Sequence, residues 1–502
     1  MHQTLAVPTA GPRSVRASRV PRPRTEPEPG RRAGYWTRLL PALAALALLT
    51  RLPSFRHPLW SPDEGYLAVQ ARQLATGGAL YDTVVDRKPP LLPWLYEGAF
   101  ALFGDTSLGP LRLAAVAAQL LTAALLASLA RRRWGDRAGA AAGILHLLVS
   151  TGLNPEDAQA ATFEVFMLPF TAAAVRCADR AQWARAGLAV AGALLTKQTG
   201  GAALLPVLWL LWRTAPRRRA ALLRTGAALC GPVLLGALVT GPARFLFWTV
   251  TGSAAYASFT GSELHVLARG LANTALLAVA CAGIVPPVVR VLRIARTGAA
   301  DLWLWLASSA GAVLTGFHFF GHYYLQLVPP LVLLAAGALQ ILPPHRLHRA
   351  LGASVCACAL FLGWGLLAPR PELAHAERLA AAVRARSAPH DRVLVWGIHP
   401  ETYWLAGRAP ATRYLTAGLL TNYSGGRDGP QVGEKYAVAG TWPVFRTELA
   451  ARPPALIVDD SRGKPYAPDR LPSLRRLLAA HYAPLARRVD GAVLYVRAQP
   501  PG

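Results

Sequence analysis

Two adjacent carboxylates open the first long polar segment of the chain, in the run Ser61-Pro62-Asp63-Glu64. Ser-Pro followed by acidic residues is typical of a helix start, because the N-terminal end of a helix carries partial positive charge. One interpretation is therefore a capped helix with no chemical role. The other is that Asp63 faces a cavity and acts as a general base. Neighbouring carboxylates on a helix point in different directions, so Glu64 need not share that role.

Two cations follow in the run Arg87-Lys88, ahead of a short, proline-interrupted apolar stretch at about 89–103. This stretch fits a re-entrant or interfacial helix better than a membrane span. The cations at its start are either simple interfacial anchors or ligands of a phosphate. Lysine is rare here, and an ammonium and a guanidinium are not equivalent beside a phosphate, which favours the second interpretation. The chain has only four lysines among 53 basic residues, namely Lys88, Lys197, Lys435 and Lys464.

Further ionisable and aromatic residues occur inside or beside apolar blocks. Glu164 lies within or near the outer end of one block, where an acidic residue is costly and indicates a functional cavity, unless it sits at the water interface. His322 and Tyr323 lie in an aromatic run from 317 to 324. Such a run is either an ordinary interfacial belt or part of the lining of the same outer cavity.

The elements that must position these residues are membrane helices. Of 502 residues, 53% are apolar and only 16% are charged, whereas soluble domains carry about 25% charged residues. The apolar residues fall into blocks long enough to cross about 30 Å of hydrocarbon. We therefore predict a polytopic α-helical membrane protein. Eleven spans are expected, at about 36–52, 107–130, 138–153, 161–178, 186–196, 200–212, 221–240, 268–289, 302–317, 324–342 and 350–368.

The net charge of +27 is explained by membrane topology rather than by a nucleic-acid-binding function. Arginines gather in alternate loops between apolar blocks, which places those loops in the cytoplasm. We expect residues 1–34 to be a disordered cytoplasmic tail and residues 35–369 to be the membrane domain, with a first outer loop at 53–106. Residues 370–502 then lie outside a plasma membrane.

Residues 370–502 are predicted to form a small α/β domain. Strands are expected at 392–396, 455–458 and 492–496, with an amphipathic helix at about 472–481. Asp459-Asp460 is the one catalytic candidate in this domain, although acidic residues commonly end strands as loop formers. The five cysteines form neither a disulfide framework nor a zinc-binding spacing.

Together, these residues resemble bacterial GT-C membrane glycosyltransferases, specifically the protein O-mannosyltransferase-like and aminoarabinose-transferase-like group (glycosyltransferase family 39 type). The likeness covers about residues 36–345, and it depends on the order of several motifs rather than on one. The tyrosine after Asp63-Glu64 stands one residue closer than in some relatives. The motifs are Asp63-Glu64 with Tyr66, Arg87 to Leu91 with Trp94, Phe103-Gly104, Arg112, Thr162 to Phe166, Thr196-Lys197, His322 to Leu325 and Pro329-Pro330.

The resemblance implies a polyprenyl-phosphate-linked sugar as the donor, used beside the membrane lipid on the extracytoplasmic face. The acceptor is a hydroxyl of a protein, lipid or glycan, and the transfer inverts the sugar. Asp63 would be the catalytic base, with Glu164 as the second acidic residue of the cavity. Lys88 would contact the phosphate, with Lys197 and Tyr323 near the donor. Glu64, Arg87 and His322 complete the expected substrate-binding set.

Two other classes of protein stay open. A lipid or solute transporter or flippase would place charged residues near the membrane midplane and would often show internal repeats, whereas the polar residues here concentrate at the outer face. A membrane scaffold that displays residues 370–502 as a binding module is the other alternative. We expect no obligatory cofactor. A divalent metal stays open because acidic groups converge outside, but no tight carboxylate motif indicates one.

Overall fold

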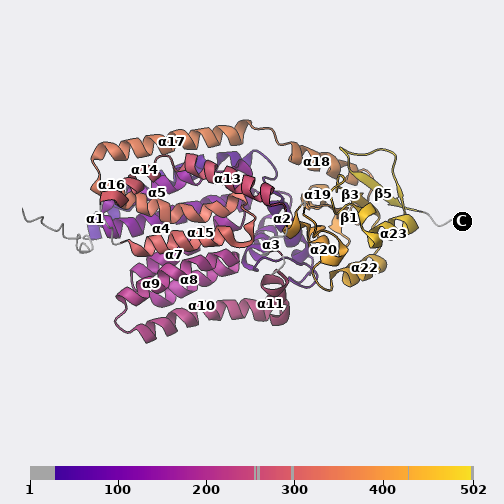
Figure 1. Cartoon of the computed structure of the whole chain (residues 1–502), viewed down its shortest axis with the longest axis horizontal. Helices are drawn as coiled ribbons and strands as arrows, with labels where there is room; N and C mark the ends of the chain where they lie inside the picture. Colours follow the sequence, from indigo (N-terminus) through magenta and orange to yellow (C-terminus); the bar gives the residue numbers. More distant parts are fainter. Residues whose placement is uncertain (1–28, 254–255, 257–260, 295–298, 428, 499–502) are drawn as a thin grey trace, which may run out of the picture.

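A computed structural model describes residues 29–498, except 254–255, 257–260, 295–298 and 428. A long helical bundle forms one end of the molecule and a smaller α/β unit forms the other (Figure 1). Residues 1–28 of the predicted 1–34 tail lie outside the described residues. Residues 29–34 were expected to be disordered, but they belong to helix α1 (Pro29–Thr50). The architecture is therefore the predicted one, a mostly helical membrane protein with a small C-terminal sheet.

The long helices of the bundle coincide with the predicted spans. Four helical stretches are long and apolar enough to cross a membrane, judged on the described residues, namely Gly109–Trp134, Arg218–Thr240, Gly321–Ile341 and Pro344–Arg384. The bundle contains α1 (Pro29–Thr50), α4 (Gly109–Trp134), α5 (Asp136–Val149), α7 (Phe163–Asp179), α8 (Trp183–Thr196), α9 (Leu204–Thr214), α10 (Arg218–Thr240), α13 (Glu263–Ala280), α14 (Val285–Ile294), α15 (Ala300–Leu314), α16 (Val328–Ile341) and α17 (Pro344–Leu367).

One predicted span is divided in the structure. The expected helix at 268–289 ends at Ala280, and α14 begins only at Val285. Two consecutive prolines at 286 and 287 explain the break, because proline lacks the N–H that continues a helix and is tolerated at a helix start. Gly283 in the break lies against α17, where a Cβ would meet the carbonyl oxygen of Ala350 at 2.2 Å.

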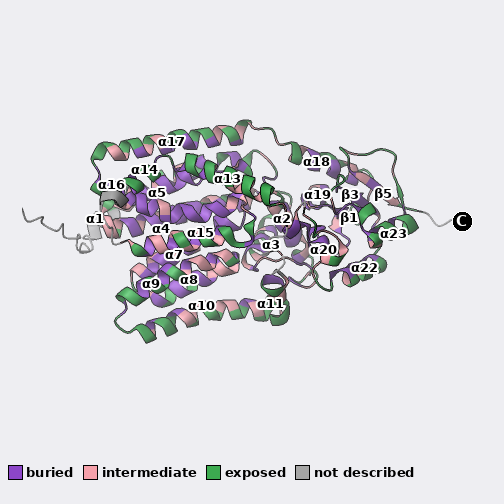
Figure 2. Cartoon of the chain, in the orientation of Figure 1, coloured by how far each residue is buried: buried purple, intermediate pink, exposed green. Residues whose placement is uncertain are grey.

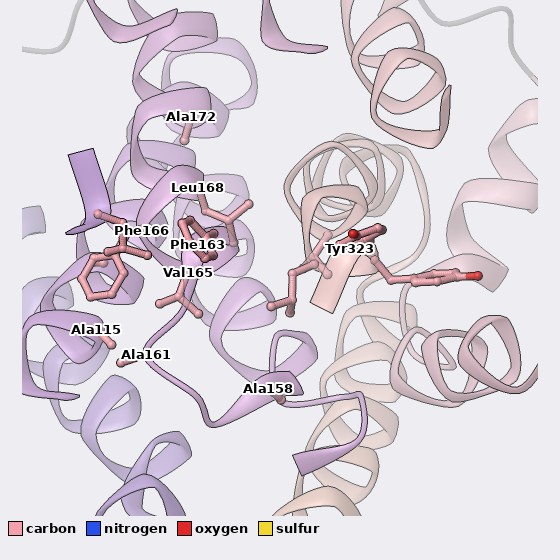
Figure 3. Packing of buried hydrophobic residues seen from close by; sticks show 14 of the residues in the cluster. Ala115, Ala158, Ala161, Phe163, Val165, Phe166, Leu168, Ala172 and Tyr323 are labelled. Atoms are coloured by element: carbon pink, nitrogen blue, oxygen red, sulfur yellow. The ribbon is translucent and has the colours of Figure 1, made fainter. Parts of the chain in front are cut away.

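The surface of the bundle is apolar where lipid would surround it. Helix α10 exposes Leu234, Leu235, Leu238 and Val239, each by more than 60%. Figure 2 shows α10 and α17 largely exposed, whereas α4 and α5 between them are largely buried. Inside the bundle, the apolar side chains at the start of α7 pack in a cluster that also contains Tyr323 (Figure 3). A row of exposed leucine and valine side chains is typical of a surface that contacts lipid.

The first outer loop contains two helices, as its sequence predicts. Helix α2 (Pro62–Ala75) begins at Ser61, whose hydroxyl accepts a hydrogen bond from the Glu64 N–H at 3.4 Å. Helix α3 (Leu91–Phe103) starts directly after Pro89-Pro90. Its 13 residues rise about 20 Å, which is too short to cross a bilayer. Short elements elsewhere on this side of the bundle are α6 (Pro155–Ala158), α11 (Pro242–Thr249) and the 3₁₀ segments at 198–203 and 321–327.

The C-terminal unit is a five-stranded mixed sheet with strand order β2-β1-β3-β5-β4. The predicted strands and amphipathic helix are confirmed within one or two residues. The strands are β1 (Arg392–Trp396), β2 (Ala409–Pro410), β3 (Leu456–Asp459), β4 (Tyr482–Pro484) and β5 (Val493–Arg497). The helices are α18 (Pro371–Arg384), α19 (Glu401–Ala406), α20 (Gly418–Thr421), α21 (Tyr423–Gly426), α22 (Thr441–Ala451) and α23 (Pro472–His481).

The α/β unit docks on the first outer loop through α19 and α2. At Gly65 of α2, an added Cβ would lie 2.5 Å from Cβ of Glu401, so only glycine permits this approach. The indole N–H of Trp404 donates to the carbonyl of Asp105 at 3.0 Å. This contact fixes the α/β unit over the end of the bundle that carries α2 and α3 (Figure 1).

Candidate active site

A cavity of about 1010 Å³ lies where the bundle, the first outer loop and the α/β unit meet. Its walls come from α2, the 86–88 segment, α6, both 3₁₀ segments, the 398–400 loop and the helices α20 and α21 with Arg427. Cavities of this size hold complete ligands with little solvent exposure. Six of the eight expected site residues line it, namely Asp63, Arg87, Lys88, Lys197, His322 and Tyr323.

Asp63 faces the cavity from the first turn of α2, with its side chain 44% exposed. Its Oδ2 lies 4.0 Å from Nε2 of His322. On the other side of the imidazole, Nδ1 of His322 lies 2.6 Å from Oδ1 of Asp157 in α6. His322 is thus held in position by Asp157 and turned toward Asp63. An accessible carboxylate of this kind has the freedom to accept a proton from a bound hydroxyl.

Arg87 and Lys88 form a cationic wall of the cavity. The Arg87 guanidinium packs over the ring of Tyr256 at 5.0 Å, and its Nε and Nη2 are buried without a hydrogen-bond partner. Lys88 Nζ lies 5.5 Å from the ring centre of Phe163. Two cations with unpaired hydrogen-bond donors can bind a phosphate.

Asp86 holds the backbone of Arg87 and Lys88 in place. Its Oδ1 accepts hydrogen bonds from the backbone N–H groups of Arg87 at 2.6 Å and Lys88 at 3.3 Å, and Gln70 donates to its Oδ2 at 3.2 Å. Burial raises the pKa of Asp86, while the charge of Lys88 and the Arg87 N–H oppose that rise. The carboxylate therefore fixes the turn that presents both cations.

Lys197 belongs to the cavity, but Glu164 does not. Lys197 Nζ forms an ion pair with Oε1 of Glu164 and lies 4.0 Å from the ring centre of Tyr323. The Glu164 side chain is fully buried and lies behind the lysine, outside the lining of the cavity. The expectation that Glu164 is a second acidic group facing the cavity therefore does not match the geometry. Its carboxylate instead orients Lys197.

Glu64 also differs from its expected placement. Its carboxylate is fully buried and accepts hydrogen bonds from the backbone N–H groups of Trp60 at 2.6 Å and Ala161 at 2.7 Å. Arg112 lies 3.7 Å away as its counter-charge. Glu64 therefore ties the first outer loop to the segment before α7. The physical reason is helix periodicity, since Glu64 is rotated about 100° from Asp63 and points into the protein.

Several cavity residues were missed in the sequence. The sequence gives no local signal for Asp157, because its contact with His322 spans 165 positions. Asp86 carried no signal beyond its place before Arg87-Lys88. Arg269 and Arg427 also line the cavity, and the sequence places them far apart, in the bundle and in the α/β unit. In the described part of the chain, no group of three His, Cys, Asp or Glu residues is arranged to hold a metal ion.

The bundle, its outer cavity and the appended sheet define the class of this protein. The chain has the fold of GT-C membrane glycosyltransferases. Residues 87–248 match the family described as dolichyl-phosphate-mannose-protein mannosyltransferase. The matched part contains Arg87, Lys88, Glu164 and Lys197, but neither Asp63 nor His322.

Solved structures resemble this chain over nearly its whole length. ArnT from Cupriavidus metallidurans bound to undecaprenyl phosphate superposes with a TM-score of 0.60 at 18% identity, covering 92% of this chain and 98% of ArnT. Its apo state gives 0.61 with the same identity and coverage. An oligosaccharyltransferase from Archaeoglobus fulgidus gives 0.49 at 12% identity, covering 93% and 74%. A comparison with curated protein sequences finds no match.

Proposed function

We propose that this chain is a membrane glycosyltransferase that moves a sugar from a polyprenyl-phosphate-linked donor to an acceptor hydroxyl. The observation that carries this function is one cavity in which the carboxylate of Asp63 faces the same space as Arg87 and Lys88. A general base and a phosphate site are the two parts that this reaction requires. The undecaprenyl phosphate bound to ArnT and the dolichyl-phosphate family name support a lipid-linked donor.

Asp63 is the proposed general base. As the acceptor oxygen forms its bond to the anomeric carbon, Asp63 takes the hydroxyl proton, and the bond from that carbon to the phosphate oxygen breaks. Attack comes from the face opposite the phosphate, which inverts the anomeric centre. His322, held by Asp157, orients the cavity beside Asp63 and supports its negative charge when the imidazole is protonated.

Arg87 and Lys88 are proposed to stabilise the leaving polyprenyl phosphate. Negative charge grows on the phosphate as its bond to the sugar breaks, and prearranged cations stabilise that charge in a site from which much of the water is excluded. The free Nε and Nη2 of Arg87 are donors that a phosphate would satisfy. Lys197, with its ammonium against Tyr323, is placed to contact the donor from the bundle side.

The proposed orientation puts the cavity and the α/β unit on the extracytoplasmic face. Arginine-rich loops occupy the opposite end of the bundle, around 131–133 and 217–219, which is the cytoplasmic end by the positive-inside rule. A donor whose prenyl tail stays in the bilayer then presents its phosphate at the outer surface. Residues 35–369 are the catalytic membrane domain in this proposal, and residues 370–502 cap its cavity.

The test is sugar transfer in proteoliposomes from a panel of radiolabelled polyprenyl-phosphate sugars to a cell-envelope extract. Asp63→Asn is expected to lower the rate by about 10²–10⁴-fold, the usual contribution of a general base. Asp469→Asn is the matched control, because Asp469 is exposed and lies outside the cavity. Equal turnover by wild type and Asp63→Asn would refute the assigned base. Movement of donor lipid across the membrane with no transfer of label would favour a flippase.

A further inference from the structure

His322 keeps its position beside Asp63 through a contact with Asp157. Nδ1 of the imidazole lies 2.6 Å from Oδ1 of Asp157, and Nε2 on the other side of the ring lies 4.0 Å from Oδ2 of Asp63. The second oxygen of Asp157 packs against Gly321, where an added Cβ would clash with it. The carboxylate therefore has little room to move by itself, and its position follows that of α6, the helix that carries it.

Helix α6 is too short to hold its own position. It has four residues, Pro155–Ala158, and isolated helices shorter than about 12 residues are marginal in water. The backbone N–H groups of residues 157–159 bond back to the carbonyls of Asn154 and Pro155. The carbonyl groups at the C-terminal end of a helix have no partner within it and must find one elsewhere. Contacts with other elements must therefore place α6, and Asp157 with it.

Arg51 supplies these partners from the joint between α1 and the first outer loop. Its Nη1 donates to the carbonyl of Ala158 at 2.5 Å, and its Nη2 donates to the carbonyls of Gln159 and Ala160 at 3.1 Å each. Figure 3 shows Ala158 and Ala161 on this segment, where the chain leaves α6 and leads into α7. A cation is favourable at the C-terminal end of a helix, and a planar guanidinium can hold several acceptors at once. Arg51 is therefore the C-terminal cap of α6.

A second set of hydrogen bonds strengthens the same joint. Ser54 Oγ lies 2.9 Å from the carbonyl oxygen of Gln159 and 2.8 Å from its Oε1. Nε2 of Gln159 donates to the carbonyl of Thr50 at 3.0 Å. All of these side chains, with that of Arg51, are buried. The end of α1 and the end of α6 thus form one buried polar joint, and a change in this joint moves α6.

The charge of Arg51 is more than a structural joint requires. All the hydrogen bonds that Arg51 donates in the described part of the chain go to neutral carbonyls, and its Nε has no partner. A buried charge is costly unless it is paired, and Arg133 shows the paired arrangement, with Asp179 at 2.9 Å and Asp301 at 2.7 Å. Charge-assisted hydrogen bonds are shorter and stronger than neutral ones. The guanidinium therefore gives α6 a more rigid position than neutral groups would.

We propose that Arg51 is a positioning residue for the reaction at Asp63. By fixing the C-terminal end of α6, it holds Asp157 against His322 and so sets the orientation of the imidazole beside Asp63. Arg51 is absent from the lining of the cavity, so it acts through α6 and touches neither donor nor acceptor. This inference rests on the proposed function and deepens it. Misplacement of a reacting group by about 1 Å can lower a rate by about 10²-fold.

The imidazole of His322 reports this role without any substrate. The full chain is labelled with ¹⁵N-histidine in lipid bilayers, and the ring-nitrogen resonances are recorded by solid-state NMR. The His322 resonances are those lost in His322→Gln, and Asp157→Asn shows where they move when the carboxylate contact is lost. Arg51→Met is expected to move them in the same direction. Arg38→Met, at an exposed position earlier in α1, is the matched control and is expected to leave them in place.

A double-variant cycle on sugar transfer tests the consequence for the reaction. Arg51→Met is expected to lower kcat per folded molecule by about tenfold or more, with the KM for the lipid-linked donor changed less than twofold. In the His322→Gln background, the same substitution is expected to lower kcat less than twofold, because the effects of residues that act through one another are not additive. Arg51→Lys keeps the cation without the fork, so its kcat is expected to lie between those of wild type and Arg51→Met.

Two results would overturn the positioning role. One is an unmoved His322 resonance in folded Arg51→Met protein, and the other is an equal fold loss of kcat in both backgrounds. If Arg51→Met does not fold, Ser54→Ala takes its place, because it removes only the hydroxyl that contacts Gln159. The same direction of change is expected there, and an unmoved resonance would again overturn the role. Absence of sugar transfer by wild type would count against the proposed glycosyltransferase instead, since the NMR measurement needs no transfer.

Discussion

The ion pair between Lys197 and Glu164 places two full charges at the inner edge of the cavity, with side chains only 3% and 0% exposed. Burying both charges costs stability, and their mutual attraction offsets that cost only while both partners are present. The second carboxylate oxygen of Glu164 has no partner, so the pair is a poor choice for stability alone. Its position next to Tyr323 fits a cation held ready for a ligand.

A variant cycle at this pair separates stability from function. Glu164→Gln leaves Lys197 as an unpaired buried charge and is expected to lower the free energy of unfolding by about 3–5 kcal/mol. Glu164→Gln/Lys197→Met removes both charges and is expected to regain most of that loss in thermal unfolding. Sugar transfer by the double variant should stay low, because the donor-side cation is gone. Wild-type transfer by the stable double variant would exclude a role for Lys197.

At the scale of elements, the approach of α2 to α19 decides where Asp63, the proposed base, lies. Asp63 lies two residues before Gly65, the point at which α2 contacts Glu401. Any side chain at Gly65 pushes α19 away and changes the wall that carries Ile398 and His399. The glycine is thus required for a close approach of two helices rather than for a turn.

Gly65→Ala is therefore expected to destabilise the docked unit by about 1–3 kcal/mol, the usual cost of overpacking. Limited proteolysis should show faster cleavage between the bundle and the α/β unit, with reduced sugar transfer. Gly98→Ala in α3 is the matched control, because nothing lies within 4 Å of a Cβ at that position. Equal protease resistance of the two variants would contradict the tight contact.

A histidine on the same α/β wall makes folding stability depend on pH. Burial lowers the pKa of His399, but its hydrogen bond to Glu401 at 3.0 Å and the charge of that carboxylate outweigh burial, so the pKa is raised above its ordinary value of 6.5. The folded state then binds a proton more tightly than the unfolded state. The stabilisation is fully present below pH 6.5 and is lost as the pH rises through the raised pKa.

Thermal unfolding measured between about pH 5 and 8, the range in which histidine changes charge, tests whether the stabilisation by His399 falls as the pH rises. His399→Gln is expected to lose less stability than wild type as the pH rises through this range, because the contribution of His399 is gone. His390→Gln serves as the control, since His390 is 86% exposed and should leave the slope unchanged. A His399→Gln profile parallel to that of wild type would refute the assignment.

At the scale of the whole molecule, the bundle and the α/β unit share one cavity. Arg370 connects them, since its guanidinium contacts the Trp60 carbonyl and lies 3.3 Å from Glu156. Asp82 of the first outer loop contacts Arg244 of α11 at 3.0 Å and Arg413 of the α/β unit at 3.6 Å. These contacts lie around the cavity, so the reaction proposed at Asp63 would take place between three parts of the chain.

The sequence by itself determined the class of this fold. Apolar blocks of membrane length must become helices, because hydrocarbon offers no partner for a free N–H or C=O group. Short continuous apolar runs likewise predicted β1, β3 and β5 of the α/β unit, whereas the short strands β2 and β4 were not predicted. The start of α2 at Ser61 and of α3 after Pro90 followed from local capping and proline chemistry. These properties depend on neighbours in the chain, which is why they could be predicted.

Only the tertiary structure decided how the site residues are used. Asp63 and Glu64 are identical in kind and adjacent, yet one faces the cavity and the other binds Trp60 and Ala161 inside the protein. The hydrogen bond between His322 and Asp157 joins positions 165 residues apart. Arg269 and Arg427, from the bundle and the α/β unit, both line the same cavity. Exposure and long-range contact depend on packing among all the helices, and a local sequence pattern carries no record of that packing.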